Sequence, residues 1–415
     1  MMTIRKRSVH FLWAFTLFIL TACTMTQAPI GNPEAPYPPR DVVVGDIYHL
    51  PTGVKVSAEE MLAAISDARI VYVGETHDNP AAHRLQLKIL KDMVARYPGQ
   101  VSLGMEMFNR SQQEVLDRWV TGMLDEKTFL KDVDWYGTWK MDFAYYADIL
   151  HFARDAGIPV IGLNATQEMV RALGRQTPEE LDPQTRSQLP EFDFDDPYQT
   201  AMTQAIYADH TQGESMLAGF QRIQTLWDET MAESITRHLQ AKGPNQRMVV
   251  LAGGNHIRYG FGIPRRVFRR LPTSYVLVGV REIDLPKDKQ DGLMDVEMPP
   301  FPMPPYDYLV YTAYESLDSK RVKLGVHMKE ENGRVVVEAV VPQSAADLAG
   351  VRQGDVIVAL GETEIADMFD LIYAVRQYAS GDQSVMIVER DQTPITLNVT
   401  FTPMPEADRK VHPQE

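Results

Sequence analysis

Two histidines and two glutamates beside glycine-containing segments have the side chains needed to bind a divalent metal. They are Glu75, His77, Glu106 and His256. Two imidazole nitrogens and one carboxylate form a common ligand set for a catalytic metal, and this set leaves one coordination position open for water. His77, His256 and one of the two glutamates could hold an ion such as zinc or manganese. The remaining glutamate could then act as the general base of a hydrolase.

A simpler interpretation of the same residues is structural. The sequence has no His-Glu-x-x-His helix motif, and both histidines could instead hydrogen-bond the backbone at the ends of strands. Asparagine and aspartate often cap helices and turns, which accounts for Asp78, Asn79 and Asn164. Capping accounts less well for histidine and glutamate, because neither is a preferred cap. We therefore favour one shared pocket.

The segments that precede these side chains predict the strands of a parallel sheet. Four short apolar runs are rich in β-branched residues and do not alternate with polar ones, as in strands buried on both faces. The runs cover residues 68–73, 101–105, 158–163 and 248–252. Amphipathic helices are expected over 81–96 and 142–156. This order predicts an α/β fold with a mostly parallel sheet flanked by helices, in which ligands bind beyond the carboxyl ends of the strands.

The composition indicates a globular protein and argues against nucleic acid as a partner. The 415 residues include 41 Lys+Arg and 56 Asp+Glu, which gives a formal net charge of −15. Nucleic acid is bound by clustered basic side chains, which this acidic chain does not concentrate. A hydrophobic content of 44% with 23% charged residues is typical of folded proteins, and the length predicts two or three domains.

Residues 1–22 are typical of a secretory signal peptide. A basic stretch at 5–7 precedes an apolar run at 11–20, and small residues come just before Cys23. Cys23 is the only cysteine, so an intramolecular disulfide, a Cys-x-x-Cys site and covalent c-type haem attachment are excluded. The segment resembles the lipobox of bacterial lipoproteins, which implies a lipidated Cys23. Thr24 follows it, and by resemblance to Gram-negative lipoproteins this favours the outer membrane.

Two proline-rich segments divide the rest of the chain. Residues 23–44 predict an extended tether, because proline lacks the N–H donor that a sheet or helix needs. The tether would leave the lipid as the only contact with the membrane and would let the protein face the periplasm. A second proline cluster lies within 286–319, which we interpret as a linker between two domains.

Residues 45–285 resemble the ChaN family of iron-regulated, haem-binding lipoproteins. The motifs that carry the resemblance are VYVGETHDNP at 71–80, LGMEMF at 103–108, GLN at 162–164, GGNH at 253–256 and GIP at 262–264. The family belongs to a superfamily with the Tiki, TraB and erythromycin-esterase-like proteins. In that superfamily, Gly-x-x-His motifs and a glutamate build the active site of a metalloprotease or hydrolase. The matching positions here are Gly74 to His77, Glu106, and Gly253 to His256.

The resemblance implies haem as the cofactor, a role in haem or iron uptake or handling, and a homodimer that sandwiches two haems. It also implies tyrosine as the iron ligand, with histidine or basic side chains on the propionates. A phenolate suits ferric iron. The candidate haem-binding residues are His77, Asn164, Tyr145, Tyr146, His256 and Tyr259. Family resemblance favours haem binding without catalysis, and metal-dependent hydrolysis is the alternative.

Residues 320–402 resemble a bacterial PDZ domain of the kind attached to HtrA-like proteases. Short alternating strands are expected from residue 322 to 399, with one helix over 368–378, so the domain should be small and of the α+β class. Leu324, Gly325 and Val326 match the loop that binds the terminal carboxylate of a protein or peptide partner. The alternative is a module that only packs on the first domain or dimerises. Residues 403–415 form a tail.

Overall fold

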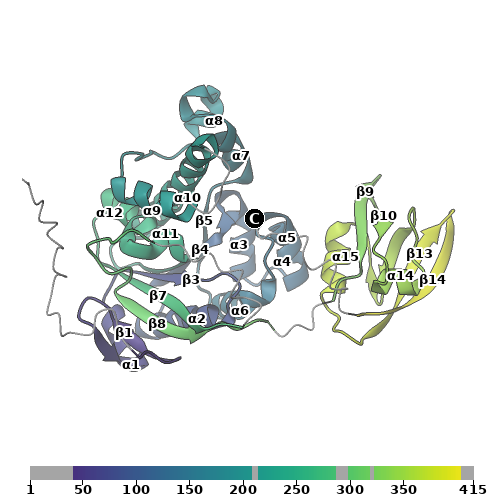
Figure 1. Cartoon of the computed structure of the whole chain (residues 1–415), viewed down its shortest axis with the longest axis horizontal. Helices are drawn as coiled ribbons and strands as arrows, with labels where there is room; N and C mark the ends of the chain where they lie inside the picture. Colours follow the sequence, from purple (N-terminus) through teal and green to yellow (C-terminus); the bar gives the residue numbers. More distant parts are fainter. Residues whose placement is uncertain (1–40, 208–213, 287–297, 318–321, 403–415) are drawn as a thin grey trace, which may run out of the picture.

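Two domains follow one another along the chain (Figure 1). The computed structural model describes residues 41–207, 214–286, 298–317 and 322–402. The expected signal peptide, Cys23, most of the tether and the tail at 403–415 lie outside these ranges. Among the described residues, no helix is long and apolar enough to cross a bilayer.

The strands form two separate sheets, one in each domain. The first sheet contains β1 Ile47–His49, β2 Val54–Val56, β3 Ile70–Glu75, β4 Val101–Asn109, β5 Val160–Asn164, β6 Arg247–Gly253, β7 Tyr275–Asp284 and β8 Tyr308–Ala313. The second contains β9 Val326–Glu331, β10 Arg334–Val340, β11 Val356–Leu360, β12 Thr363–Glu364, β13 Gln383–Arg390 and β14 Thr393–Thr400.

Helices surround the first sheet, and the second domain contains fewer helices than the first. The α-helices are α1 Ala58–Ile65, α2 Pro80–Arg96, α3 Gln113–Val120, α4 Glu126–Asp132, α5 Trp135–Thr138, α6 Ala147–Asp155, α7 Gln167–Arg175, α8 Pro183–Ser187, α9 Pro197–Tyr207, α10 Glu214–Lys242, α11 Gly254–Ile257, α12 Ile263–Arg270, α14 Ala345–Ala349 and α15 Met368–Val375. The 3-10 helices are η1 Arg110–Gln112, η2 Phe143–Tyr145, η3 Pro178–Glu180 and η4 Arg258–Gly260.

The first sheet is mostly parallel, as the sequence predicts. Its eight strands run in the order β2-β1-β8-β7-β3-β6-β4-β5, and the pairs from β8 to β5 are parallel. Strand β6 lies between β3 and β4, although it comes much later in the sequence. The carboxyl ends of these three strands therefore meet at one edge of the sheet.

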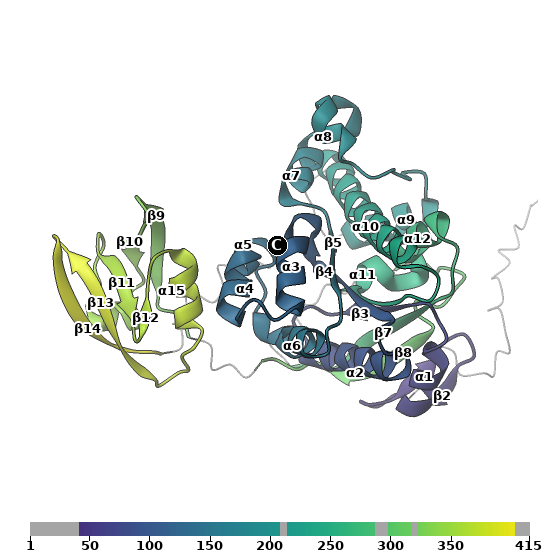
Figure 2. The same cartoon turned by 180° about the vertical axis from the view of Figure 1, so that it is seen from behind.

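Each face of the sheet is covered by its own set of helices. Along β3, Val71 and Val73 pack into one core with α1, α2 and α6, whereas Ile70 and Tyr72 pack into the other with α10 and α12. Successive side chains of a strand point to opposite faces, so a strand covered on both sides must be apolar throughout. Figures 1 and 2 show α2 and α6 on the face opposite α10 and α12.

The first domain continues past the proline cluster, which differs from the expected linker at 286–319. Strand β8 lies within that range, and it pairs in parallel with β7 and antiparallel with β1. Leu309, Val310 and Tyr311 of β8 are buried in the two cores. A proline removes a backbone hydrogen-bond donor only at its own position, so a proline cluster need not mark the end of a domain. The expected helix over 142–156 also differs, because it is split into η2 and α6.

The second domain has the expected small α+β architecture. Strands β14-β13-β11-β10-β9 form a continuous antiparallel path, and β12 pairs with β11. The path leaves β9 at one edge, with only β10 as a recorded partner among the described strands. Helices α14 and α15 contribute Ala346 and Leu371 to a separate hydrophobic core.

The position of β8 predicts where the first domain can be cut. A fragment ending at residue 285 lacks the three buried side chains of β8, each worth about 1.5–3 kcal/mol. That loss is a large part of the roughly 5–15 kcal/mol that stabilises a typical domain. We expect fragment 41–317 to unfold cooperatively on heating, as followed by circular dichroism, and fragment 41–285 to be unfolded or aggregated. Equal melting temperatures would show that β8 is dispensable.

Candidate functional site

Five ionisable side chains meet at the carboxyl ends of β3, β4 and β6, and we call them the strand-end cluster. The cluster consists of Glu75, His77, Glu106, Asp228 and His256. Four of these residues are those expected from the sequence, and Asp228 joins them from the middle of α10. The converging segments are far apart in the sequence, and the strand order brings them together.

Glu75 and His77 form the first half of the cluster. His77 Nδ1 lies 2.7 Å from Glu75 Oε1, and the same oxygen accepts a 2.7 Å hydrogen bond from the Tyr146 hydroxyl. The Gln86 amide donates to Glu75 Oε2 at 2.6 Å. Burial alone would raise the pKa of Glu75, but the neighbouring His83 and the bond to His77 outweigh it, so the pKa is lowered. Glu75 is therefore a buried carboxylate with its oxygens occupied.

His256 lies between two carboxylates in the second half of the cluster. Its Nδ1 is 2.7 Å from Asp228 Oδ1, and its Nε2 is 3.3 Å from Glu106 Oε1. Burial alone would lower the pKa of His256, but the charges of Glu106 and Asp228 raise it to about 10. Burial alone would raise the pKa of Glu106, but His256 lowers it to about 2. His256 is thus an imidazolium at neutral pH, with both ring nitrogens directed at anions.

The geometry does not support the expected metal set of His77, Glu106 and His256. Both ring nitrogens of His256 lie against carboxylates, Nδ1 against Asp228 and Nε2 against Glu106. Within the described part of the chain, no group of three or more histidine, cysteine, aspartate or glutamate side chains has a geometry that could hold a metal ion.

His77 is the member of the cluster that reaches solvent. Its side chain is 39% exposed, whereas the side chains of Glu75, Glu106 and His256 are at most 9% exposed. Burial lowers the pKa of His77, but the bond to Glu75 and the charge of Glu106 raise it above the ordinary value. The Trp139 ring stands perpendicular to the His77 ring, with 5.0 Å between the centroids. The mouth of the cluster thus presents an imidazole with a raised pKa beside an indole.

Close packing explains two of the glycines in the motifs. A Cβ atom on Gly253 would lie 3.1 Å from the His77 ring, and the Gly253 N–H donates to Glu106 at 2.6 Å. A Cβ atom on Gly262 would lie 2.3 Å from the backbone oxygen of His256, which excludes any side chain there. These glycines let α11 and its neighbours approach the cluster closely enough to orient both histidines.

The candidate haem-binding residues apart from the histidines take different positions. Tyr146 is fully buried and donates to Glu75, which raises its pKa well above the ordinary value. Tyr145 is half-buried, with its ring 5.5 Å from that of His83. Asn164 binds the backbone, because its amide nitrogen donates to the Glu106 carbonyl at 3.1 Å and its oxygen accepts from Ala165.

Tyr259 lies in η4, directly after the helix that carries His256, and its ring belongs to a separate aromatic group. It is half-buried and adopts a left-handed conformation with φ 59°, which is unusual for a bulky side chain. Its ring stacks on Phe261 at 5.4 Å and meets Phe301 edge-on at 4.8 Å. Burial raises its pKa, although Arg258 acts in the opposite direction. Backbone strain of this kind is often found at ligand sites.

Sequence reasoning missed the residues that fix His256. Asp228 is completely buried, and its second oxygen accepts a 2.5 Å hydrogen bond from the Gln199 amide. Gln224 lies one helical turn before Asp228, and its amide nitrogen packs 3.1 Å from His256 Nδ1, whose proton is donated to Asp228. The signal that could have indicated Asp228 and Gln224 is their position on the inward face of the long helix α10. Carboxylate and amide groups are buried only when they have partners.

The loop expected to bind a carboxylate in the second domain has a fixed shape. Gly325 has φ +81°, and a Cβ atom there would lie 2.1 Å from the Ser344 Cβ. The Gly325 carbonyl accepts from Val341 N at 2.9 Å and from the Ser344 hydroxyl at 3.2 Å. The Leu324 carbonyl accepts from Ala346 N, and Val326 begins β9. The loop thus leads directly into the edge strand.

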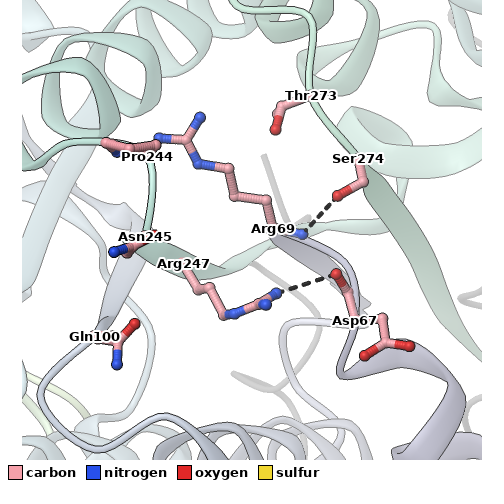
Figure 3. Close-up of a pocket in the computed structure, with 8 residues that line it drawn as sticks. All are labelled: Asp67, Arg69, Gln100, Pro244, Asn245, Arg247, Thr273 and Ser274. Atoms are coloured by element: carbon pink, nitrogen blue, oxygen red, sulfur yellow. Dashed lines mark hydrogen bonds between the residues drawn. The ribbon is translucent and has the colours of Figure 1, made fainter.

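A cavity of about 260 Å³ lies at the opposite edge of the first sheet, where the strands begin (Figure 3). Its two arginines already bind backbone carbonyls. Arg69 donates to the carbonyls of Leu239 and Gly243 at the end of α10, and Arg247 donates to three carbonyls between α1 and β3. These arginines fasten the loops at that edge, and the cavity is remote from the strand-end cluster.

Comparisons with known proteins match each of the two domains to a family. Residues 61–267 match the family described as haem-binding uptake, Tiki superfamily, ChaN, and residues 322–401 match the PDZ domain. A structure showing cofacial haem binding to ChaN of Campylobacter jejuni is similar at a TM-score of 0.50 with 17% identity, over 66% of this chain and 97% of that one. At this identity the likeness concerns the fold.

A further relative is the chloroplastic protein RETICULATA-RELATED 5 of Arabidopsis thaliana. It is 24% identical over 249 residues, which cover 55% of this chain. The chain spans 33% of the length of that relative. The two family matches define a Tiki-superfamily domain followed by a PDZ module. The first domain belongs to the ChaN family, and the second is a PDZ domain.

The pairing of His256 with Asp228 predicts a pH dependence of stability. The pKa of His256 is raised to about 10 in the folded chain, so its contribution is complete below the unfolded value of about 6.5 and is lost as the pH rises towards 10. One bound proton corresponds to a slope of about 1.4 kcal/mol per pH unit. We expect the free energy of unfolding to fall more steeply between pH 7.5 and 9.5 in the wild type than in Asp228→Asn, as measured by urea denaturation.

The matched control is Asp195→Asn, which removes an exposed carboxylate from a nearby loop. It should leave the slope unchanged. At pH 6, Asp228→Asn should cost roughly 1–3 kcal/mol, because a charged hydrogen bond is lost inside the protein. Parallel pH profiles for the wild type and Asp228→Asn would mean that Asp228 does not set the pKa of His256.

Proposed function

We propose that this chain is an outer-membrane lipoprotein that binds haem at the strand-end cluster, for uptake or handling of haem iron, and recruits a protein partner through its PDZ domain. The observation that carries the haem proposal is the solvent-facing His77 with its raised pKa, in a domain of the ChaN family. A raised pKa favours the protonated form of this imidazole, which is suited to a haem propionate because a charge-assisted hydrogen bond is stronger than a neutral one.

Haem, when bound, would supply a ferric iron that needs an axial ligand from the protein. Tyr146 is poorly suited, because its buried hydroxyl is used by Glu75 and has a raised pKa. Tyr145 and Tyr259 are the half-buried alternatives. We favour Tyr259, since its backbone is strained and its aromatic neighbours, the stacked Phe261 and the edge-on Phe301, offer aromatic surface to a planar ligand.

His256 and Asp228 would then have a supporting role. The imidazolium neutralises Glu106, and both remain fixed by Asp228 and the Gly253 N–H. Glu75 orients His77 in the same way through Nδ1, which leaves Nε2 as the nitrogen that could donate to a ligand. Haem in the Campylobacter relative is bound cofacially, and we propose a haem-linked homodimer for this chain too.

Haem titration of the chain from residue 24 onward tests the binding proposal. We expect a Soret band that saturates stoichiometrically, with affinity reduced about tenfold or more in His77→Ala, since a charge-assisted bond contributes roughly 1.5–3 kcal/mol. Tyr259→Phe should remove the phenolate-to-iron charge-transfer band, whereas Tyr146→Phe should keep it. If the charge-transfer band is retained in Tyr259→Phe and lost in Tyr145→Phe, the axial ligand is Tyr145.

The same titration can reject the proposal outright. A protein with no spectral change on adding haem, at concentrations where its folded state is verified by circular dichroism, would not be a haem carrier. Sedimentation with and without haem tests the dimer, which should appear only in the loaded protein. A monomer that carries haem would contradict the homodimer and leave haem binding intact.

Lipid attachment at Cys23 is proposed from the sequence alone. In a Gram-negative host supplied with labelled palmitate, the wild type should incorporate label and fractionate with the outer membrane. Cys23→Ser should lose both properties, because the thiol is the acylation site. Thr24→Asp is the sorting control: it should keep the label and move the protein to the inner membrane. Label in the Cys23→Ser protein would contradict the anchor.

A further inference from the structure

Helix α15 of the PDZ domain is docked on helices α4 and α5 of the first domain. Figures 1 and 2 both show α15 as the element of the PDZ domain that faces α4 and α5. We call this the docking contact. It is formed by Lys127, Lys131, Tyr136 and Asp142 of the first domain with Asp367, Phe369, Asp370, Tyr373 and Arg376 of the second.

Four ion pairs hold the docking contact. Lys127 pairs with Asp370 at 2.8 Å, and Lys131 pairs with Asp367 at 2.6 Å and with Asp370 at 3.6 Å. At the other end of α15, Arg376 pairs with Asp142 at 2.9 Å. Exposed pairs are individually weak, at about 0–1 kcal/mol. Asp370, however, has a side chain only 6% exposed, and its pKa is lowered by Lys127 against the effect of burial.

Aromatic rings fill the centre of the docking contact. The rings of Tyr136 and Phe369 stack with 5.6 Å between centroids and 29° between planes. The Arg376 guanidinium lies 4.4 Å from the Tyr136 ring centroid, and Lys131 lies 5.8 Å from that of Phe369. Such pairs contribute about 0.5–1.5 kcal/mol beyond the area that they bury. Together with the ion pairs, they fix the orientation of α15 on the first domain.

The opposite side of α15 faces β9, where a PDZ domain binds its peptide. The Glu330 carboxylate of β9 accepts a 2.9 Å hydrogen bond from the Met368 N–H at the start of α15. Apolar side chains on both elements, including Met328 and Met368, pack towards the core of the domain. The first turn of α15 is therefore bound on one side by Glu330 and on the other by the two lysines of the docking contact.

Residues 136–146 form one short segment that joins the docking contact to the strand-end cluster. At the docking contact the segment presents Tyr136 and Asp142. At the cluster, its Trp139 stands 5.0 Å from His77 and its Tyr146 donates to Glu75 at 2.7 Å. Asp142 also accepts from Ala144 N at 2.8 Å, so the residue that holds Arg376 begins the turn that leads to Tyr146.

We propose, resting on the haem and peptide binding proposed above, that residues 136–146 and α15 couple the PDZ groove to the haem site. A peptide that adds alongside β9 competes with Glu330 for the start of α15, which loosens the docking contact. Loosening releases Tyr136 and Asp142, and with them the positions of Trp139 and Tyr146 beside His77 and Glu75. Peptide binding should therefore weaken haem binding, and haem should weaken peptide binding by the same factor, because binding linkage is reciprocal.

The geometry also defines the partner. A free terminal carboxylate fits the loop at Gly325, and an antiparallel peptide strand on β9 would place a residue about four positions before its terminus opposite Glu330. A lysine or arginine there would pair with the displaced carboxylate. The partner is thus a protein C-terminus with an apolar last residue and a basic residue upstream.

Coupling is tested with the chain from residue 24 onward and with decapeptides that end in Val, Leu or Phe and carry lysine four positions earlier. Amidated versions serve as the peptide control. We expect a saturating free-carboxylate peptide to raise the Kd for haem by about fivefold or more, the lower range of such couplings. Haem should raise the Kd for the peptide, measured by calorimetry, by the same factor. Amidated peptides should change neither.

Variants of the docking contact should remove the coupling. Without peptide they should already bind haem with the weakened affinity of the peptide-saturated wild type, and peptide should not weaken it further. Phe369→Ala and Arg376→Ala break the contact without touching the groove strand or the cluster. The matched controls are Leu348→Ala, which removes an apolar side chain that is 71% exposed, and Arg334→Ala, which removes the pair with Glu389. Both controls should keep the wild-type coupling. Equal haem affinity with and without peptide in the wild type, or no binding of the wild type by any peptide of the set, would overturn the proposal.

A second measurement separates this proposal from the haem proposal. The ring of Trp139 lies against His77, so a change in their contact should shift the proton resonances of the His77 ring. A shift on adding peptide, absent from Phe369→Ala, would support coupling even in a protein that takes up no haem. Haem uptake with no effect of peptide and no shift at His77 would retain the haem site and refute the coupling.

Discussion

Three carboxylates lie buried at the carboxyl ends of the parallel strands, and the first domain depends on how their charge is neutralised. Burying a carboxylate without a partner is so costly that it would take up a proton instead. Two histidines prevent this by placing ring nitrogens against Glu75, Glu106 and Asp228. One consequence is that His256 is held as a cation. The other is that His77 is held by Glu75 through Nδ1 while its side chain remains 39% exposed.

The surrounding fold serves this charge balance. Glycines at the end of β6 and before α12 bring the backbone close to both histidines. Helix α10 contributes the inward-facing Asp228 from one face of the sheet, and Tyr146 contributes a hydroxyl from the other. Because each polar group has a partner, the cluster adds rigidity without leaving an unpaired buried charge. Such a fixed set of charges is suited to binding an anionic ligand and poorly suited to ligating a metal.

The PDZ domain extends the same system beyond the sheet. Its helix α15 lies between β9 and the first domain, so one helix contacts both the edge strand of the PDZ domain and the neighbouring domain. The aromatic and acidic residues of 136–146 run from this helix to the cluster. In the proposal made above, this arrangement lets the PDZ domain influence the site of its own chain.

The sequence by itself determined the elements and the motif residues. Apolar runs predict buried strands because burial on both faces constrains each position locally, and the ChaN and PDZ motifs mark both domains. It could not determine that β8 returns to the first sheet, that Asp228 pairs with His256, or that α15 docks on Tyr136. Those facts depend on strand order and helix orientation, which arise from contacts between distant segments. The charge states of the histidines also follow only from the tertiary structure, because a pKa depends on which groups lie within a few ångströms.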